Sequence, residues 1–418
     1  MQVLWGIGGM VVLLAIAFGL STNRRAINPR TVFGALAIQF VLGVVVLYWR
    51  AGKRALEAAS NAVNAIIESS NEGIEFLFGP VLPEQGLVFA FQVLPVIIFF
   101  AALTSVLYHW GILQWVVKLL GGALQFALRT SKAESTFAAS TIFVGMSEAP
   151  LVVKPYIDRA TKSELFTMMG TGLATVAGSL LVGYSLLGVR LDYLIAAAFM
   201  AGPAGIVMSK IIVPETGEPE TLVASGVDEA NEEEEKEEGE EETGESGHRN
   251  TIDAIASGTL EGLQIALTVG AMLIAFISLI ALINIILGSV GGLFGFPDLT
   301  FELILGYIFA PLAFVIGVPW EEAIGAGSFL GQKLVLNEFV AFSNFGPQAE
   351  QFSQKTVAIV TFGLTGFANF GSIAILIGTF GSIAPGRRHE VAQFGIRAVL
   401  AGTLANLMNA TIAGILIG

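Results

Sequence analysis

The strongest constraint on this chain comes from its apolar runs, several of which are long enough to cross a lipid bilayer. A transmembrane helix needs about 20 mainly apolar residues, whereas a strand of a membrane barrel alternates over about 10 residues. The runs at residues 87–107 and 193–213, for example, are continuous and do not alternate. The chain is therefore expected to be an all-α polytopic membrane protein.

The composition supports this class and excludes others. Of the residues, 54% are hydrophobic and 13% charged, and the mean hydropathy is +0.75, whereas soluble domains carry about 25% charged residues. Cysteine is absent, which excludes disulfides, thiolate metal sites and cysteine nucleophiles. The histidines, His109, His248 and His389, are too scattered in the sequence to predict a metal site.

The net charge of −13 comes mostly from one segment, Asp228 to Glu245. Such a run of like charges is typical of a solvated, disordered loop. We therefore expect an acidic cytoplasmic loop at residues 214–250, without a catalytic role.

Basic residues give the orientation of the predicted spans. Arg24, Arg25 and Arg30 follow the first apolar run, and positive charge marks the cytoplasmic side. A cleaved signal peptide carries its charge first and is not expected.

The predicted fold has about eight spans, with both termini outside. They lie at residues 3–20, 32–49, 87–107, 165–187, 193–213, 263–287, 356–383 and 392–417. An amphipathic surface helix is expected at residues 50–78, and a short oblique helix at residues 303–318.

Two further segments are apolar at their ends and polar in the middle, which favours re-entrant hairpins over full spans. The first, at residues 135–156, contains Glu148, and the second contains Glu338. A charge at bilayer depth costs about 2.5–3.5 kcal/mol on insertion scales. Such residues persist mainly where they face a cavity, a partner or a substrate, so both carboxylates are candidates for function.

The two hairpins belong to an internal repeat. A hairpin with Ser147-Glu148 precedes a span with Gly-x-Ala-Thr175, and a hairpin with Asn337-Glu338 precedes a span with Gly-x-Ala-Asn369. The charge map puts the two hairpins on opposite sides of the membrane, which makes the repeat inverted. Inverted repeats place the substrate site near the midplane, where helices break. Breaks are expected at Thr175 and Asn369.

Phe367, Asn369 and Ser372 lie close together in the seventh span. An aromatic face, an amide and a hydroxyl beside two carboxylates suit a ring that bears several hydroxyls. Ordinary helix packing is the alternative. Lys333 either pairs with Glu338 or another carboxylate, or extends to the membrane surface.

A cation site is a further candidate. Thr141 and Thr175 would supply hydroxyls, and Val144 and Val176 would supply backbone carbonyls. This requires that the helix is unwound there.

Three motifs resemble those of the concentrative nucleoside transporters. They are Gly331-x-Lys333-x-x-x-Asn337-Glu338-Phe339-Val340-Ala341-Phe342, Gly145-Met146-Ser147-Glu148-Ala149-Pro150-Leu151 and Gly366-Phe367-Ala368-Asn369-Phe370-Gly371-Ser372-Ile373. The resemblance extends from the third predicted span to the eighth. It implies a homotrimer in the plasma membrane that imports nucleosides with a cation, and a transport domain that moves as an elevator along a scaffold.

The resemblance also implies roles for individual residues. Glu148, Glu338, Asn369 and Ser372 would bind the substrate, with Glu338 and Asn369 at the ribose. Ser147, Leu180 and Phe367 would approach the base, and the sodium-site positions match Thr141, Val144, Thr175 and Val176. The implied division is scaffold helices at 1–130, transport repeat 1 at 131–213, the acidic loop at 214–250, scaffold at 251–318 and transport repeat 2 at 319–418.

Two positions depart from the family pattern. Met146 stands where many members have Gln, which predicts a shift in base preference toward purines. Thr141 stands where sodium-coupled members can carry Asn, so proton coupling through a carboxylate such as Glu148 is the alternative to sodium.

Rival functions fit less well. A membrane hydrolase would need a motif such as His-Glu-x-x-His or Gly-x-Ser-x-Gly, and neither occurs. We expect no enzymatic activity, no cofactor besides the coupling ion and no nucleic-acid partner. A passive carrier or channel on the same fold stays open.

Overall fold

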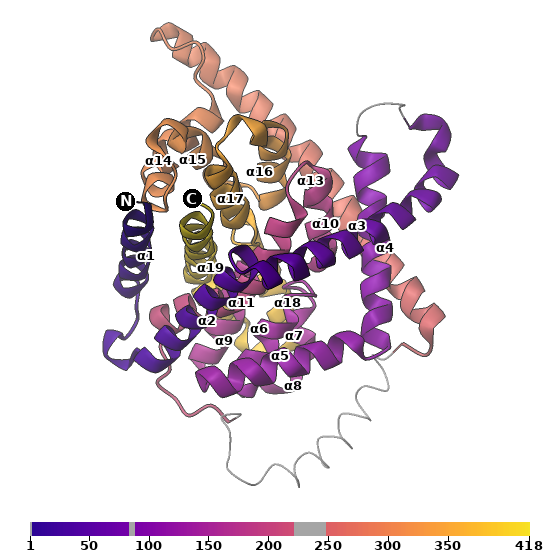
Figure 1. The fold of residues 1–418 in the computed structure, drawn as a ribbon, viewed down its shortest axis with the longest axis vertical. Coiled ribbons are helices and arrows are strands. Elements are labelled where there is room, and N and C mark those ends of the chain that lie inside the picture. Colours follow the sequence, from indigo (N-terminus) through magenta and orange to yellow (C-terminus); the bar gives the residue numbers. More distant parts are fainter. Residues whose placement is uncertain (1, 83–87, 221–247) are drawn as a thin grey trace.

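The computed structural model describes residues 2–82, 88–220 and 248–418, and every regular element in these ranges is a helix (Figure 1). The all-helical fold expected from the sequence is confirmed. The acidic segment from Asp228 to Glu245 lies outside the described residues, so its prediction is untested.

The N-terminal part agrees with the predicted spans and contains one additional helix. Its helices are α1 (Gln2–Gly19), α2 (Pro29–Leu47), α3 (Arg50–Phe78), α4 (Phe89–His109) and α5 (Ile112–Leu128). The surface helix predicted at residues 50–78 is α3. Helix α5 was read from the sequence only as a basic cytoplasmic region. It is amphipathic, and it buries Leu113, Val117 and Leu128 while Trp115 and Phe126 stay exposed.

Both segments predicted as hairpins form short helices joined by turns, and both predicted breaks are present; that the hairpins are re-entrant remains a prediction. Hairpin 1 comprises α6 (Lys132–Ser140), α7 (Ala149–Val152) and α8 (Lys154–Ile157). Hairpin 2 comprises α15 (Trp320–Val335) and α16 (Glu338–Phe345). The fourth predicted span divides into α9 (Lys162–Ala174) and α10 (Gly178–Leu186). The seventh divides into α17 (Gln354–Leu364) and α18 (Ser372–Ile383). Residues 175–177, called break 1 below, and residues 365–371, called break 2, therefore interrupt corresponding spans of the two repeats.

The remaining helices are α11 (Leu191–Ile212), α13 (Thr251–Leu293), α14 (Phe301–Val315) and α19 (Arg388–Ile417). Short 3-10 segments lie at Arg24–Ala26, Gly79–Val81, Gly346–Gln351 and Pro385–Arg387. Among the described residues, 6 helices are long and apolar enough to span a membrane, or up to 7 if α14 and α15, bent by 116°, form one span. The number of eight spans remains a prediction.

The core is formed by the helices that carry the breaks and their neighbours. The apolar window of the α9–α10 span is 94% buried and that of α11 is 89% buried, whereas that of α13 is only 11% buried. Helix α13 packs along α4 on the outside of this core (Figure 1). Gly262 permits this contact, because a Cβ there would lie 2.7 Å from the Cβ of Ala101.

The two ends of the chain lie together. A Cβ on Gly6 of α1 would meet the side chain of Ile415 near the end of α19, and the two ends lie near each other on the left side of the view (Figure 1). This arrangement agrees with termini on one side of a membrane, and the outside location remains a prediction.

A buried ion pair joins hairpin 1 to the core. Lys210 of α11 pairs with Glu134 of α6, and the Lys210 Nζ also donates to the Ser163 Oγ at 3.0 Å. The side chains of Lys210 and Glu134 are 8% and 1% exposed. A buried charge that loses its partner is strongly destabilising, because its desolvation is no longer offset.

We predict that Lys210→Met lowers stability by about 3–5 kcal/mol, because Glu134 is left as an uncompensated buried carboxylate. Thermal unfolding of the detergent-purified protein measures this change. Lys162→Met, at the exposed start of α9, is the control and should unfold like the wild type. The double variant Lys210→Met/Glu134→Met should recover part of the loss. Equal unfolding temperatures for Lys210→Met and Lys162→Met would contradict the prediction.

Candidate functional site

Hairpin 2 presents Glu338 at the start of a helix. The hairpin breaks after Val335, and Asn337 caps α16 by accepting a hydrogen bond from the Val340 amide at 2.8 Å. A capping residue of this kind fixes where the helix begins. Glu338 is thus the first residue of α16, and it is 5% exposed.

Glu338 lies in a hydrogen-bonded array with the residues of break 2. Its Oε2 accepts from the Asn369 Nδ2 at 3.2 Å. The Asn369 Oδ1 accepts from the Ser372 amide at 2.9 Å and from the Ser372 Oγ at 3.1 Å. Glu338, Asn369 and Ser372 were predicted to share a site, and the structure brings them together.

Tyr184 completes this array and was not singled out in the sequence. Its hydroxyl donates to the Glu338 Oε1 at 3.2 Å, so repeat 1 holds the carboxylate of repeat 2. The ring is fully buried and stacks on Phe342 with centroids 4.6 Å apart. Tyr184 follows Leu180 by four residues on α10, which places the two on one helix face. This spacing was the one indication in the sequence that Tyr184 faces the same site as Leu180.

Hairpin 1 places its polar residues differently. Met146 is 3% exposed, and its Cβ faces Gly172, whereas Ser147 is exposed. The Glu148 Oε2 accepts from the Gly145 amide at 2.8 Å. The Glu148 carboxylate also lies close to the carboxylate of Glu261 on α13.

The structure therefore does not join the two hairpin carboxylates directly. In the described part of the chain, no hydrogen bond links Glu148 to Glu338. Phe367 is half-buried beside the Asn369 array, and Leu180 is 7% exposed on α10.

The candidate cation ligands lie where hairpin 1 meets break 1. The Gly178 amide donates to the Phe143 carbonyl at 3.2 Å, which holds the hairpin turn against the break. The Thr141 Oγ1 donates to the Ala138 carbonyl at 3.0 Å, and the Thr175 Oγ1 donates to the Gly172 carbonyl at 3.1 Å. A hydroxyl that donates still has lone pairs for a cation.

The carbonyls expected as further ligands fit this role. Within the described residues, no donor reaches the Val144 or the Val176 carbonyl, and neither residue is helical. Two hydroxyl and two carbonyl oxygens form a hard donor set of the kind that sodium accepts, so the residues present fit such an ion.

Lys333 lies within electrostatic range of Glu338 but forms no ion-pair contact with it. Its side chain is buried, so it does not extend to the membrane surface. Its Nζ donates to the Gly363 carbonyl at 2.9 Å and to the Asn406 Oδ1 at 2.6 Å, rather than to Glu338 or another carboxylate. The sequence could not reveal this, because Asn406 lies 73 residues away.

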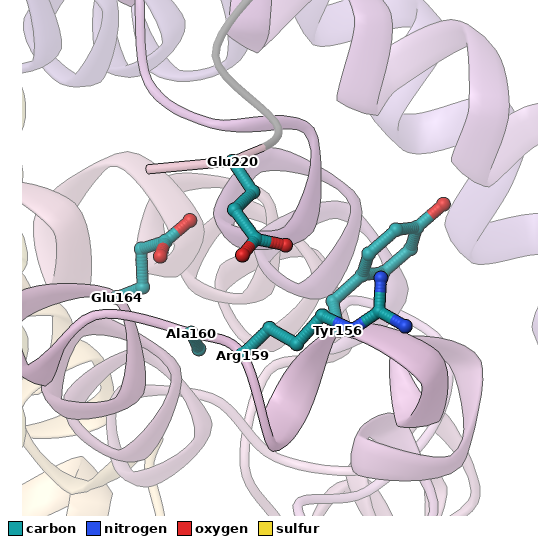
Figure 2. Close-up of a pocket in the computed structure, with 5 residues that line it drawn as sticks. All are labelled: Tyr156, Arg159, Ala160, Glu164 and Glu220. Carbon is teal, nitrogen blue, oxygen red and sulfur yellow. The ribbon is translucent and has the colours of Figure 1, made fainter. Parts of the chain in front are cut away.

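A surface pocket lies away from these residues. It is lined by Tyr156, Arg159, Ala160, Glu164 and Glu220, near the connection between α8 and α9 (Figure 2). It contains none of the candidate substrate or cation ligands.

Three family models match the chain. The description "Na+ dependent nucleoside transporter C-terminus" matches residues 193–414. "Na+ dependent nucleoside transporter N-terminus" matches residues 8–81, and "Nucleoside recognition" matches residues 90–190.

Individual relatives cover the whole chain. It is 53% identical to "Uncharacterized transporter YutK" of Bacillus subtilis over 100% of both chains. It is 45% identical to "Nucleoside permease NupC" of Helicobacter pylori, over 99% of this chain and 98% of that one. It is 35% identical to "Sodium/nucleoside cotransporter 1" of Mus musculus, over 98% of this chain and 63% of that one.

Solved structures agree with these matches. The chain is 50% identical to CNTnw in an inward-facing substrate-bound state, with a TM-score of 0.92 over 100% of this chain and 98% of that one. An outward-facing variant of CNTnw gives the same TM-score, 0.92. The protein is a transporter and not an enzyme. On these matches and on its motifs, the chain belongs to the family of concentrative, Na+-dependent nucleoside transporters.

Proposed function

We propose that this protein is a secondary active symporter that imports nucleosides across the plasma membrane, driven by a sodium gradient. The observation that carries the proposal is the buried array of Glu338, Asn369 and Ser372, held by Tyr184. A carboxylate beside an amide and a hydroxyl can accept from and donate to neighbouring ribose hydroxyls. The aromatic face of Phe367 and the apolar Leu180 suit the base.

Sodium is the coupling ion that the donor set at break 1 supports. Thr141, Val144, Thr175 and Val176 offer hydroxyl and carbonyl oxygens, and the family models carry sodium in their descriptions. Moving one charge down a membrane potential of 100 mV releases about 2.3 kcal/mol. That free energy supports a substrate gradient of roughly 40-fold.

Proton coupling is the second candidate, and the contact between Glu148 and Glu261 favours it. A proton shared between neighbouring carboxyl groups would relieve the repulsion between them. A movement of hairpin 1 away from α13 would then release a shared proton. A passive carrier on the same fold would use neither gradient.

Alternating access is proposed to occur by an elevator movement. The repeats at 131–213 and 319–418 would form the transport domain, and the helices at 1–130 and 251–318 would form the scaffold of a homotrimer. The family's solved structures support a large movement, because CNTnw is seen in inward-facing, outward-facing and intermediate states. The exposed apolar side chains of α13 suit lipid or a neighbouring subunit.

We predict that proteoliposomes accumulate labelled uridine or adenosine under an inward sodium gradient, at fixed voltage. A proton gradient alone should give no accumulation. The matched control is equal sodium on both sides, which should give equilibration only. Accumulation under the proton gradient alone would instead indicate proton coupling through Glu148 and Glu261. Glu261→Gln should then abolish this proton-driven accumulation. Accumulation under neither gradient would contradict symport.

We predict that Glu338→Gln raises the KM for nucleosides about tenfold or more, because hydrogen bonds to a charged acceptor are worth about 1.5–3 kcal/mol. Tyr184→Phe should raise the KM less, since it removes only one donor to Glu338. Uptake kinetics measure both changes. The control is Tyr156→Phe, a tyrosine of the surface pocket. A wild-type KM in Glu338→Gln would contradict the assignment of this site.

We predict that Met146→Gln lowers the ratio of adenosine to uridine transport, because an amide can donate to and accept from a pyrimidine edge, whereas a thioether is only a weak acceptor. Competition between the two labelled nucleosides measures the ratio. Met168→Gln, in the buried middle of α9, tests whether any polar group in the core has this effect. An unchanged ratio in Met146→Gln would contradict the predicted shift toward purines.

A further inference from the structure

Asn406 lies where the two broken spans meet. It belongs to α19 and is fully buried. Its Nδ2 donates to the Ala174 carbonyl at 2.6 Å and to the Thr365 carbonyl at 2.8 Å. Ala174 ends α9 and Thr365 caps α17, so one amide group satisfies a carbonyl at the C-terminal end of two half-helices from different repeats.

Lys333 binds the amide oxygen of the Asn406 side chain. The Asn406 Oδ1 accepts from the Lys333 Nζ at 2.6 Å, and the same Nζ donates to the Gly363 carbonyl at 2.9 Å. The C-terminal end of a helix carries about half a negative charge. Two such ends meet at Asn406, and the hydrogen bonds that the Lys333 Nζ donates there place a donor beside both of them.

Two glycines, one in break 2 and one in α19, allow α19 to lie this close to the two broken spans. A Cβ on Gly366 in break 2 would lie 2.2 Å from the Asn406 Oδ1. A Cβ on Gly402, one turn before Asn406, would lie 2.8 Å from the Leu173 Cβ and 3.1 Å from the Ala368 Cβ. Helix α19 therefore contacts the end of α9, directly before break 1, and break 2 itself.

The breaks are also bonded to each other. The Phe367 amide of break 2 donates to the Thr175 carbonyl of break 1 at 3.1 Å. Break 1 carries the candidate cation ligands Thr175 and Val176, and break 2 carries the candidate nucleoside ligands Phe367 and Asn369. A change in the position of either break is thus transmitted to the other through short contacts.

We propose that Asn406 and Lys333, called the Asn406–Lys333 clamp, are positioning residues that fix both breaks together and thereby link cation affinity to nucleoside affinity. The second part rests on the proposed function. A link of this kind is a coupling free energy, so each ligand must tighten the other by the same factor. Asn406 acts through the backbone of residues 174–175 and 363–367, and Lys333 acts through the same contacts and through its charge interaction with Glu338.

The chain offers a matched control on the same helix. Asn409 is also buried, one turn beyond Asn406, and its Oδ1 accepts from the Gln39 Nε2 of α2 at 2.6 Å. Asn409→Leu removes a buried amide from α19 without touching either break. A merely structural effect of losing such an amide should appear in both variants.

The first test measures hydrogen exchange in the purified protein without ligands. Asn406→Leu should speed exchange in peptides from both breaks, residues 174–178 and 365–372, and Asn409→Leu should speed it in neither. Faster exchange in only one break, or in none, would overturn the claim that the clamp holds both. If Asn406→Leu does not fold, Asn406→Asp replaces it, because Asp keeps the acceptor for Lys333 but has no amide hydrogens.

The second test measures the nucleoside Kd at zero and at saturating sodium. We divide the Kd without sodium by the Kd at saturating sodium. This ratio should fall about tenfold in Asn406→Leu, which corresponds to a loss of about 1.4 kcal/mol of coupling free energy. Lys333→Met should lower the ratio in the same direction, and Asn409→Leu should leave it at the wild-type value. An unchanged ratio in a variant with faster exchange in both breaks would overturn the linkage.

The two tests separate the possible failures. A wild-type ratio of one would contradict the proposed sodium coupling, and the exchange measurement would still decide whether Asn406 holds both breaks. A wild-type ratio above one that survives in Asn406→Leu would contradict the clamp and leave the proposed function standing.

Discussion

Two helices end inside the buried core, at Ala174 and at Leu364, and the rest of the structure depends on how their free backbone groups are satisfied. The last carbonyls of a helix have no partner within it, and in an apolar interior no water replaces that partner. Here the partners come from elsewhere in the chain: Asn406 for the Ala174 and Thr365 carbonyls, and the Phe367 amide for the Thr175 carbonyl. The breaks persist because these bonds connect the two repeats.

The candidate substrate array follows from the same arrangement. Once break 2 is fixed, the Asn369 amide faces Glu338, and the Glu338 carboxylate is held on its other oxygen by Tyr184 of repeat 1. Each polar group therefore has a partner before any ligand arrives. Low dielectric strengthens such networks and makes an unpaired member costly. This accounts for a carboxylate that is 5% exposed in a core that is otherwise largely apolar.

Several parts of this arrangement could be predicted from the residues. The Gly-x-Ala-Thr175 and Gly-x-Ala-Asn369 patterns predicted the breaks, and the polar middle of an apolar segment predicted the position of Glu338. Helix α5 was missed as a helix because Lys118, Arg129 and Lys132 were read as a basic connecting region. Tyr184 was missed because a tyrosine in an apolar helix has no local pattern that reveals its partner 154 residues away.

The sequence by itself determined the membrane class, the helical fold, the repeat and the places where helices stop. These properties depend on the length of apolar runs and on local glycine and proline positions, which act within a few residues. Only the tertiary structure decided that Lys333 bonds to Asn406 rather than to Glu338, that Glu148 faces Glu261, and that one amide serves both breaks. Asn406 lies 232 residues from Ala174, and contacts over such distances depend on how whole helices pack.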